Sequence, residues 1–179
     1  MAELAEIIDD DLEKGIVNAL KVNGFTEEQV RFTNNYSLKE SIGNFIKWSE
    51  TCKEKTLAGH NVVFDVSFLK DSAYRSEIEW PLFLGRPGVD RSVDLHSLCY
   101  SHYLKRKLTT PIKNTRSDIN IDKVLNYVGL PNEPRPHNAL RGTKFEAESF
   151  SRLIYGKGLL KEFQEYKIPK YLLEQLNQF

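Results

Sequence analysis

Apolar residues recur every three or four positions along several stretches of the chain, a spacing that predicts amphipathic helices. The first begins at Ser37-Leu-Lys-Glu40, a capping box whose serine and glutamate side chains bond the first backbone N–H groups. A second stripe runs from Ile121 to Val128, and Gly129 and Pro131 mark its end. A third helix is predicted from His137 to about Tyr155, with four residues facing inward: Leu140, Ala147, Phe150 and Ile154.

Short apolar runs between turn residues predict two strands. One covers Thr56 to Ala58, and the other lies within Arg91 to Leu95, where Asp94 is placed to cap a following helix. A polar loop is predicted from Lys107 to Ser117. The pattern therefore indicates an α/β chain that is rich in helix and has a small sheet. Two further short helices are predicted, one from the capping box Thr26-Glu-Glu-Gln29 and one over Tyr171 to Leu176.

Length and composition indicate one folded domain, because 179 residues with 40% apolar side chains suffice for an ordinary core. The formal net charge is zero, so bulk charge favours neither nucleic acid nor a membrane as partner. Cys52 and Cys99 lack metal-site or redox spacing, and the N-terminus lacks the pattern of a signal peptide, which predicts a cytoplasmic protein. No apolar run approaches the ~20 residues that span a bilayer, so no membrane association is expected.

Charge is nevertheless unevenly distributed. Six acids and no base lie between Glu3 and Glu13. Five bases and no acid lie between Tyr103 and Arg116. A run of like charge is usually a solvated face, and this basic run indicates binding only if it lies beside the candidate site at Asp65. Its members are Lys105, Arg106, Lys107, Lys113 and Arg116.

Two segments carry candidate chemistry. From Leu57 to Leu69 (LAGHNVVFDVSFL), a strand enters a Gly-His-Asn turn and then a helix with Asp65 in its first turn. This puts a carboxylate at the C-terminal edge of the sheet, where open α/β sheets hold metals or phosphates. In the second segment, Pro136 to Leu140 (PHNAL), His137 follows a proline-rich loop and opens the long helix. The apolar stripe of the helix that contains Asp65 comprises Phe64, Phe68 and Leu69.

These segments resemble the second and third motifs of the DEDDh 3′→5′ exonucleases, the family of bacterial proofreading subunits and related ribonucleases. The resemblance covers about residues 19–155, with 156–179 as a C-terminal helical tail, and implies an RNase H-like α/β fold with a reduced sheet. One exonuclease-like domain is thus expected over residues 1–179. The resemblance also implies hydrolysis of phosphodiesters on two metal ions, Mg²⁺ or Mn²⁺, and single-stranded DNA or RNA 3′ ends as partners.

The resemblance assigns roles to two residues. Asp65 corresponds to the third metal-binding acid of the family, because the surrounding Gly-His-Asn-x-x-Phe-Asp-x-x-Phe-Leu context matches as well. His137 corresponds to the general base, and Asn138, Ala139 and Leu140 stand in the expected places. The alternatives are an Asp65 that stabilises a helix N-terminus through the helix dipole and a His137 that caps a helix from a loop.

Three of the family's four acids are missing from their expected positions. Gly142 stands five residues beyond His137, where the family has an aspartate. Glu146, one turn further along the same helix face, is either a substitute metal ligand or a plain surface charge. The first strand of the family carries an Asp-x-Glu pair. Asp11-Leu12-Glu13 matches that pair in letters but leaves no room for the two strands that normally follow, so we interpret it as part of the acidic run.

The missing first strand is central in the family's sheet, so its loss predicts an open apolar edge at Thr56–Ala58. We expect that edge to be covered by the N-terminal segment, by a second copy of the chain in a homodimer, or by a separate chain that carries the missing strands. Three functions follow: a 3′-5′ exonuclease, a degenerate relative that binds nucleic acid or protein, and a shortened product that keeps only the fold or complements a partner chain. We also expect the two strands to be parallel neighbours, and Asp65 and His137 to lie on the same side of the sheet.

Overall fold

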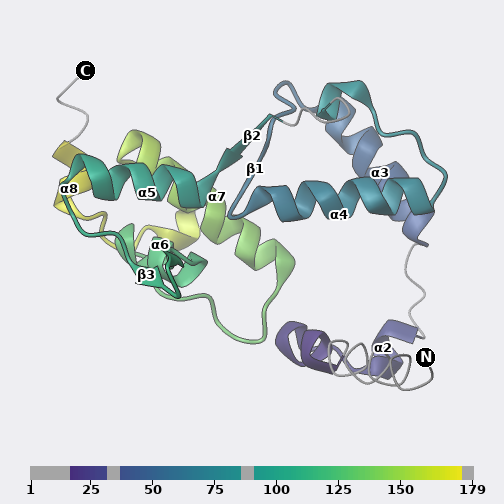
Figure 1. Cartoon of the computed structure of the whole chain (residues 1–179), viewed down its shortest axis with the longest axis horizontal. Helices are drawn as coiled ribbons and strands as arrows, with labels where there is room; N and C mark the ends of the chain where they lie inside the picture. The colour runs from purple at the N-terminus through teal and green to yellow at the C-terminus, as the bar shows by residue number, and fades with distance from the viewer. Residues whose placement is uncertain (1–16, 32–36, 86–90, 175–179) are drawn as a thin grey trace. The chain divides into compact units, whose positions relative to one another are not determined.

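The structure is a computed structural model that describes residues 17–31, 37–85 and 91–174 (Figure 1). Contacts group the chain into two compact units. The first comprises residues 1–35 and 133–142, and the second comprises residues 36–132 and 143–179. The single exonuclease-like domain expected over residues 1–179 stays a prediction.

In the first unit, residues 17–23 are helical and α2 spans Glu27–Arg31. The capping box predicted for α2 is confirmed. The Thr26 hydroxyl accepts a hydrogen bond from the Gln29 N–H at 3.1 Å, and the Gln29 side chain accepts one from the Thr26 N–H at 2.8 Å. Because both ends of the box are bonded, this short helix has a defined start.

The proline-rich segment of the first unit contacts the end of the helix over residues 17–23 and the turn that follows it. The His137 N–H donates to the Val22 carbonyl at 3.1 Å. Gly24 adopts a positive φ of 69°, and a Cβ built on it would lie 2.5 Å from Pro136 Cβ. Both the backbone conformation and the close approach of the proline ring therefore require glycine at this turn.

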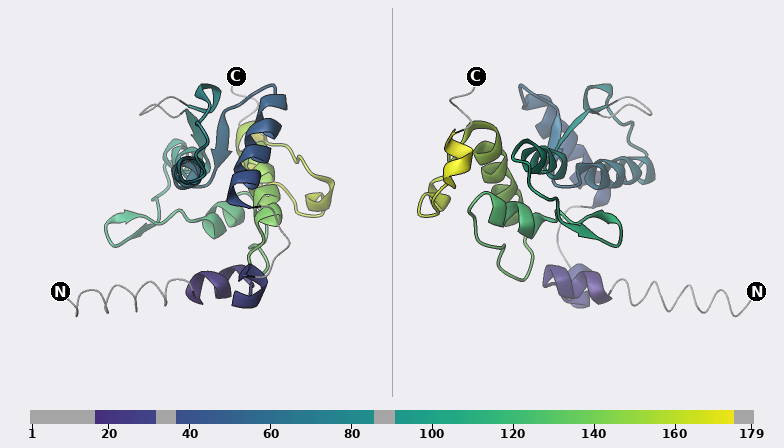
Figure 2. Two further views of the ribbon diagram at one scale, coloured as in Figure 1. Left: turned by 90° about the vertical axis from the view of Figure 1, so that its right-hand side faces the viewer. Right: turned by 60° about the vertical axis from the view of Figure 1, so that its left-hand side comes forward.

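The second unit contains a parallel pair of strands (Figure 1, Figure 2), which confirms that the two predicted strands are neighbours. β1 (Leu57–Gly59) pairs with β2 (Ser92–Asp94), with Gly59 opposite Asp94. Both strands lead directly into helices that begin at the C-terminal edge of the sheet: α4 (Val62–Arg75) after β1 and α5 (Leu95–Lys105) after β2. Within the described residues, no other strand joins this sheet. The fold is therefore α/β and helix-rich with a small sheet.

α3 (Leu38–Thr51) precedes β1 and packs against α4. Its capping box is confirmed, because the Ser37 hydroxyl accepts from the Glu40 N–H at 3.2 Å and the Glu40 carboxylate accepts from the Ser37 N–H at 2.8 Å. Ile42 is buried, whereas Leu38 is exposed. The helix is therefore placed correctly by sequence, but only part of its apolar face is covered.

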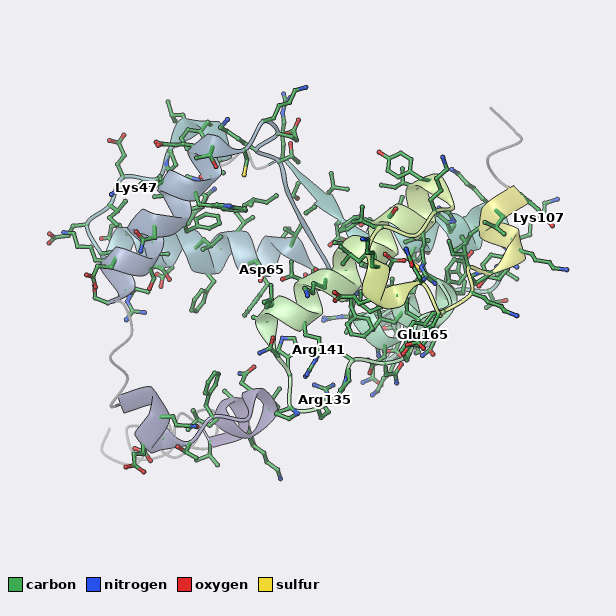
Figure 3. All side chains as sticks on the ribbon, turned by 180° about the vertical axis from the view of Figure 1, so that it is seen from behind. Lys47, Asp65, Lys107, Arg135, Arg141 and Glu165 are labelled. Atoms are coloured by element: carbon green, nitrogen blue, oxygen red, sulfur yellow. The ribbon has the colours of Figure 1, made fainter. Side chains whose placement is uncertain are left out.

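α4 buries a different set of residues from the one its apolar stripe suggested. Phe64 and Phe68 are 66% and 62% exposed, so the predicted stripe faces outward. The buried positions are Val62, Val66, Ser72 and Ala73. Figure 3 shows Asp65 on the same helix. The 3₁₀ helix η1 (Leu82–Leu84) follows α4 and buries only Leu84.

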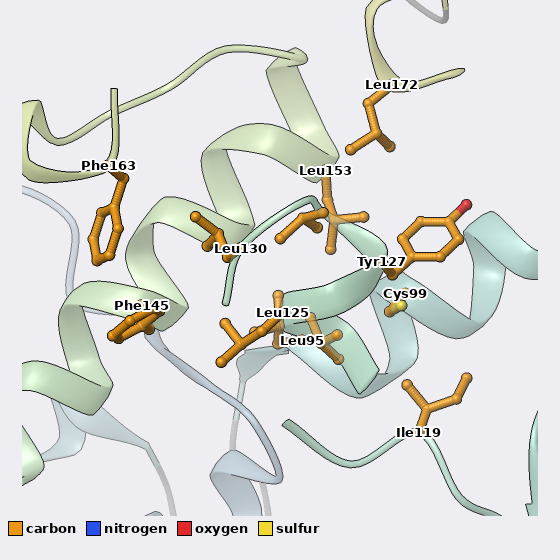
Figure 4. Close-up of a cluster of buried hydrophobic side chains, with 12 residues drawn as sticks. Leu95, Cys99, Ile119, Leu125, Tyr127, Leu130, Phe145, Leu153, Phe163 and Leu172 are labelled. Atoms are coloured by element: carbon orange, nitrogen blue, oxygen red, sulfur yellow. The ribbon is translucent and has the colours of Figure 1, made fainter. Parts of the chain in front are cut away.

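The main hydrophobic cluster lies among α5, α6 (Ile121–Tyr127) and α7 (Ala139–Tyr155), together with the segment that follows α7 (Figure 4). The helix predicted over 121–128 is confirmed, and Gly129 ends it at φ 78°. A Cβ on Gly129 would lie 2.6 Å from the Lys167 carbonyl oxygen, so this glycine also lets the C-terminal segment pack closely. The buried members of the cluster are Leu95, Cys99, Ile119, Val124, Leu125, Tyr127, Val128, Leu130, Phe145, Leu153, Phe163 and Leu172.

The inward face of α7 differs from the prediction. Leu140 and Ile154 were expected to face inward, but they are 68% and 45% exposed. The buried face instead carries Glu148 and Arg152, which are 0% and 1% exposed. Helical spacing shows which residues share a face of the helix, and apolar residues are the ones normally expected to be buried. On α7, the Glu148–Arg152 pair occupies buried positions instead.

This buried ion pair fastens the segment after α7 to the helix. Arg152 Nε donates to Glu148 Oε1 at 2.7 Å, and Glu148 Oε2 accepts from the N–H groups of residues 159–160 at 2.7 and 2.9 Å. The guanidinium also donates to the carbonyls of Val128 and Phe163, each at 3.1 Å. Both charges are thus hydrogen-bonded, which is the condition for burying them.

Two predicted segments need correction. Residues 107–117, expected to form a loop, contain a β-hairpin of β3 (Ile112–Lys113) and β4 (Arg116–Ser117). The tail expected to be helical contains only the short helices η2 (Lys161–Phe163) and α8 (Lys170–Leu173) among its described residues. Residues 175–179, which include the predicted end of the last helix, lie outside the described residues. No helix in the described part of the chain is long and apolar enough to cross a membrane.

Candidate functional site

Carboxylates bind the backbone of the turn between β1 and α4. The Asn61 N–H donates to Asp94 Oδ2 at 2.8 Å, and the Val62 N–H donates to the same oxygen at 3.4 Å. The His60 N–H donates to Glu146 Oε2 at 3.3 Å. Asn61 is left-handed at φ 59° and makes no cap with its own side chain, so the first N–H groups of α4 take their acceptor from Asp94.

Asp94 caps two helices at once. Its second oxygen, Oδ1, accepts from the N–H and hydroxyl of Ser97 at 2.8 and 3.0 Å, which caps α5 as the sequence predicted. Burial opposes the charged form, but these bonds and the N–H groups of Asn61 and Val62 outweigh it and hold the pKa of Asp94 below its ordinary value. Both oxygens of this carboxylate are therefore engaged in building the edge of the sheet.

Glu146, the candidate substitute metal ligand, also faces this turn. A Cβ built on Gly59 would lie 3.3 Å from Glu146 Oε2, which is the oxygen that accepts the His60 N–H. The turn therefore needs a small residue at position 59 so that the carboxylate can approach its backbone. Through the hydrogen bond to the His60 N–H, Glu146 supports the β1–α4 turn.

Two histidines connect the same edge to the strand–loop segment before α6. His60 Nε2–H donates to the Ile119 carbonyl at 2.9 Å. His96 Nε2 lies in hydrogen-bond contact with the Ser117 hydroxyl at 2.9 Å, and its Nδ1 lies 3.9 Å from Asp94 Oδ1. The two imidazole rings are 6.3 Å apart between centroids. Sequence spacing did not single out either ring, because their partners come from the 117–119 segment.

Asp65 stands in the first turn of α4 with an exposed side chain. Its neighbours Phe64 and Phe68 are exposed as well, and their rings stack with centroids 6.5 Å apart and an interplanar angle of 22°. Within the described part of the second unit, no ion pair involves Asp65. This surface therefore combines a carboxylate that is open to solvent with two aromatic faces.

Metal-binding geometry is not assembled within the described residues. No group of three or more histidine, cysteine, aspartate or glutamate side chains is placed there to hold a metal ion. The predicted Mg²⁺ or Mn²⁺ site has Asp65 as its best candidate ligand, since the oxygens of Asp94 and Glu146 contact the backbone. Asp11 and Glu13 lie outside the described residues.

His137 lies in the first unit and has an acidic partner that the sequence prediction missed. Its Nδ1–H donates to Glu133 Oε2 at 2.7 Å, which leaves Nε2 as the proton-accepting nitrogen of the neutral ring. Burial opposes ionisation of Glu133, but three neighbours outweigh it and hold the pKa of Glu133 below its ordinary value. They are the Asn138 N–H, His137 and the Arg141 guanidinium, whose Nε lies 3.4 Å from Glu133 Oε1. A glutamate that orients a histidine is the arrangement that a general base needs.

Gly142, where the exonucleases that the sequence resembles have an aspartate, lies against this pair. A Cβ on Gly142 would be 3.0 Å from His137 Cε1 and 3.5 Å from Glu133 Oε2. An aspartate there would therefore displace the histidine ring and bring a second negative charge beside Glu133. Glu133 could have been noticed from its spacing, four residues before His137, but the extended proline-rich segment gave no reason to expect the contact.

The structure distributes the predicted site residues over both units. Asp65 and Glu146 belong to the second unit, and His137 and Gly142 belong to the first. The predicted placement of Asp65 and His137 on one side of the sheet stays a prediction. Comparisons of the chain with protein-family models, with curated proteins and with solved structures find no match. The exonuclease resemblance therefore depends on the two motifs and their local geometry.

Proposed function

We propose that this protein is a DEDDh-type relative that binds the 3′ ends of single-stranded DNA or RNA, and that the isolated chain hydrolyses them slowly or not at all. The observation that carries the proposal is the exposed Phe64, Asp65 and Phe68 surface in the first turns of α4. Within the described residues, about two thirds of each phenylalanine side chain is uncovered, beside an exposed acid. They are suited to a ligand with flat rings and with phosphates that a bound cation can bridge.

Stacking supports a single-stranded ligand. Every base has a π-face, and stacking on an aromatic side chain contributes about 1–3 kcal/mol per base. Phe64 and Phe68 are one helical turn apart and already share a stacked orientation, so each presents a face to solvent. Duplex bases are stacked on each other and offer no such face, which favours single strands.

The carboxylates support weak catalysis. Hydrolysis on two metal ions needs several acids around both ions. In the second unit Asp65 is exposed, whereas Asp94 and Glu146 are engaged with the backbone of the turn. Each missing electrostatic contribution commonly costs a hundred- to a thousandfold in rate, about 3–4 kcal/mol. Removal of three of four metal ligands is thus expected to leave little turnover.

A second candidate function is complementation by another chain. β1 pairs with β2 on one side, and within the described residues its other side has no partner strand. An unpaired strand edge is a template for a further strand. A polypeptide that supplies an Asp-x-Glu strand at this edge would restore two acids. Exonuclease activity would then be expected of the complex.

Binding is tested by fluorescence anisotropy with a 5′-labelled single-stranded oligonucleotide. Phe64→Ala with Phe68→Ala is expected to weaken binding about tenfold or more, from loss of stacking. Tyr74→Ala is the matched control, because Tyr74 is an aromatic residue of the same helix with 82% exposure at its other end. A circular single strand, which has no 3′ end, should bind less tightly. Equal losses for Tyr74→Ala and for the phenylalanine pair would refute the binding surface.

Hydrolysis is tested with Mg²⁺ or Mn²⁺ and the same substrate. Wild type, Asp65→Ala, His137→Ala and Gly142→Asp are all expected to show little turnover, since the added aspartate would crowd His137 and supply one ligand at most. A peptide or chain with an Asp-x-Glu strand is the addition expected to raise activity. Robust metal-dependent cleavage by the wild type that Asp65→Ala abolishes would overturn the proposal of a weak isolated nuclease.

A further inference from the structure

The hairpin β3–β4 presents two positive charges side by side. Lys113 is the register partner of Arg116, and Ile112 is the partner of Ser117. The two turn residues, Asn114 and Thr115, both adopt positive φ, of 49° and 63°, as in the turns that match the twist of a tight two-residue hairpin. Directly opposite residues of an antiparallel pair project from the same face, with Cβ atoms about 4.5–5.5 Å apart. Lys113 and Arg116 therefore share one face of the hairpin.

This pairing costs stability unless an anion lies between the two cations, because like charges directly opposite each other destabilise a hairpin. Within the described residues, no carboxylate forms an ion pair with Lys113 or Arg116. The nearest acid in sequence, Asp118, is bonded to Lys123, although the charge of Lys113 also helps to lower the pKa of Asp118. Both cations are exposed, and Figure 2 shows the hairpin standing clear of the neighbouring helices.

The base of the hairpin is fastened to the edge of the sheet from which α4 begins. Ser117, on the face opposite the two cations, contacts His96 in the first turn of α5, and the Ile119 carbonyl accepts from His60 in the β1–α4 turn. The Asp118 N–H donates to the Pro111 carbonyl at 2.8 Å and closes the hairpin base. The two cations are therefore held on a fixed arm that starts beside the turn leading to Asp65.

The other bases of this run are placed differently. Arg106 stacks on Tyr171, with its guanidinium carbon 3.7 Å from the ring centroid, and donates to the Tyr127 hydroxyl at 3.3 Å. It is thus part of the packing between α5 and the C-terminal segment. Lys105 and Lys107 are exposed at and just beyond the C-terminal end of α5, and Lys105 lies about 15 Å along the helix from its first residue at 1.5 Å per residue.

We propose that the Lys113–Arg116 pair is a binding site for the phosphate backbone of a nucleic-acid strand, and that the hairpin holds the strand whose end reaches the α4 surface. This inference rests on the proposed function for the identity of the strand, and it adds a second contact region away from Asp65. Arginine and lysine neutralise phosphates with the release of counterions, which makes such binding dependent on salt and independent of sequence. A phosphate between the two side chains also removes their mutual repulsion.

The test compares Lys113→Ala with Arg116→Ala, as a double variant, against the matched double variant Lys105→Ala with Lys107→Ala. Both remove two exposed cations of the same basic run. Two phosphate contacts contribute about −1.4 to the slope of log K against log salt for a single strand. Between ~50 and ~200 mM salt, the affinity of the wild type should therefore fall about sevenfold more than the affinity of the hairpin variant. The control variant should keep the wild-type slope. Thermal unfolding followed by circular dichroism establishes that both variants are folded.

Three probes separate the possible outcomes: a single-stranded oligonucleotide, a duplex of the same length, and polyglutamate of equal charge. If the hairpin variant loses affinity for the single strand and the control does not, the inference holds. If only the Phe64 and Phe68 variant loses affinity, the hairpin inference fails and the proposed function stands. If the wild type binds the duplex but not single strands, and the hairpin variant binds the duplex more weakly, the proposed function fails and the phosphate site stands. Equal binding of polyglutamate through the hairpin, or equal losses in both double variants, would overturn the assignment to nucleic acid.

Discussion

Two regions of the second unit bury their apolar residues to different extents. In the helical core region, residues 95–132 and 143–173, twelve buried side chains form one cluster. In the strand–turn–helix region, residues 37–85, large apolar side chains remain exposed along both helices and η1: Leu38, Trp48, Val63, Phe64, Phe68, Tyr74, Leu82 and Phe83. Asp65 lies in the second of these regions. The difference indicates that one region supplies stability while the other keeps apolar and polar groups available for a ligand or partner.

Polar contacts follow the same division. In the helical core region, the Glu148–Arg152 pair is fully buried and bonded to surrounding backbone. In the strand–turn–helix region, the β1–α4 turn is instead supported by two half-buried carboxylates from outside the region, Asp94 of β2 and Glu146 of α7. Loss of a partner in the buried pair leaves an uncompensated charge, whereas loss of a cap near the surface lets water replace it. Stability should therefore respond very differently to substitution in the two regions.

The largest effect is expected from Glu148→Ala, which leaves the Arg152 guanidinium buried without its counter-charge. We expect the free energy of unfolding to fall by about 3–5 kcal/mol. Lys144→Ala is the control, because Lys144 on the same helix pairs with Glu162 of the following segment at 3.2 Å in an exposed position, where such pairs contribute about 0–1 kcal/mol. Urea unfolding followed by circular dichroism measures both variants. Similar losses of unfolding free energy in the two variants would show that burial does not increase the contribution of the Glu148–Arg152 pair to stability.

A matched pair of valines sharpens the comparison of packing. Val124→Ala removes methyl groups from the centre of the main cluster and is expected to cost about 2 kcal/mol. Val66→Ala on α4 also removes a buried side chain, but Val66 lies outside the main cluster, where we expect the surroundings to relax more easily into the space, so about 1 kcal/mol is expected. Both tryptophans, Trp48 and Trp80, lie in the strand–turn–helix region, and their fluorescence reports its unfolding separately. A larger loss for Val66→Ala would reverse the comparison.

The smallest effect concerns Asp94. Asp94→Ala removes the acceptor of the first N–H groups of two helices, and a helix cap contributes about 1 kcal/mol. Asp65→Ala, in the first turn of α4 but without such bonds, should change the free energy of unfolding by less than about 0.5 kcal/mol. Unfolding in urea at neutral pH measures both. An equal cost for the two substitutions would remove the distinction between a structural and an available carboxylate.

The Asp94 cap also has a defined pH dependence. Because folding lowers the pKa of this carboxyl below its ordinary value of 3.8, its contribution is complete above that value and is lost as the pH falls through the folded-state pKa. The stability difference between wild type and Asp94→Ala should therefore shrink as the pH is lowered below about 4. A difference that stays constant down to pH 2 or so would show that the charge of Asp94 does not contribute.

The sequence by itself determined the local elements of this protein. The capping box at Ser37, the stripe over 121–128 with Gly129 after it, and the Asp94 cap all depend on contacts within a few residues, and the structure has them where they were predicted. The parallel pairing of β1 with β2 was predicted from the resemblance of the motifs that flank them, and the register bears it out.

The tertiary structure alone decided which side chains meet. Glu148 and Arg152 have the spacing of an ordinary surface pair, and only the packing of residues 156–168 against α7 buries them. Glu146 was expected as a metal ligand or a surface charge, yet it contacts the backbone N–H of His60, 86 positions away in sequence. Periodicity describes which residues share a face, but the use of that face depends on what long-range folding places against it. For the same reason the outward direction of the Phe64 and Phe68 stripe could not be deduced from its spacing.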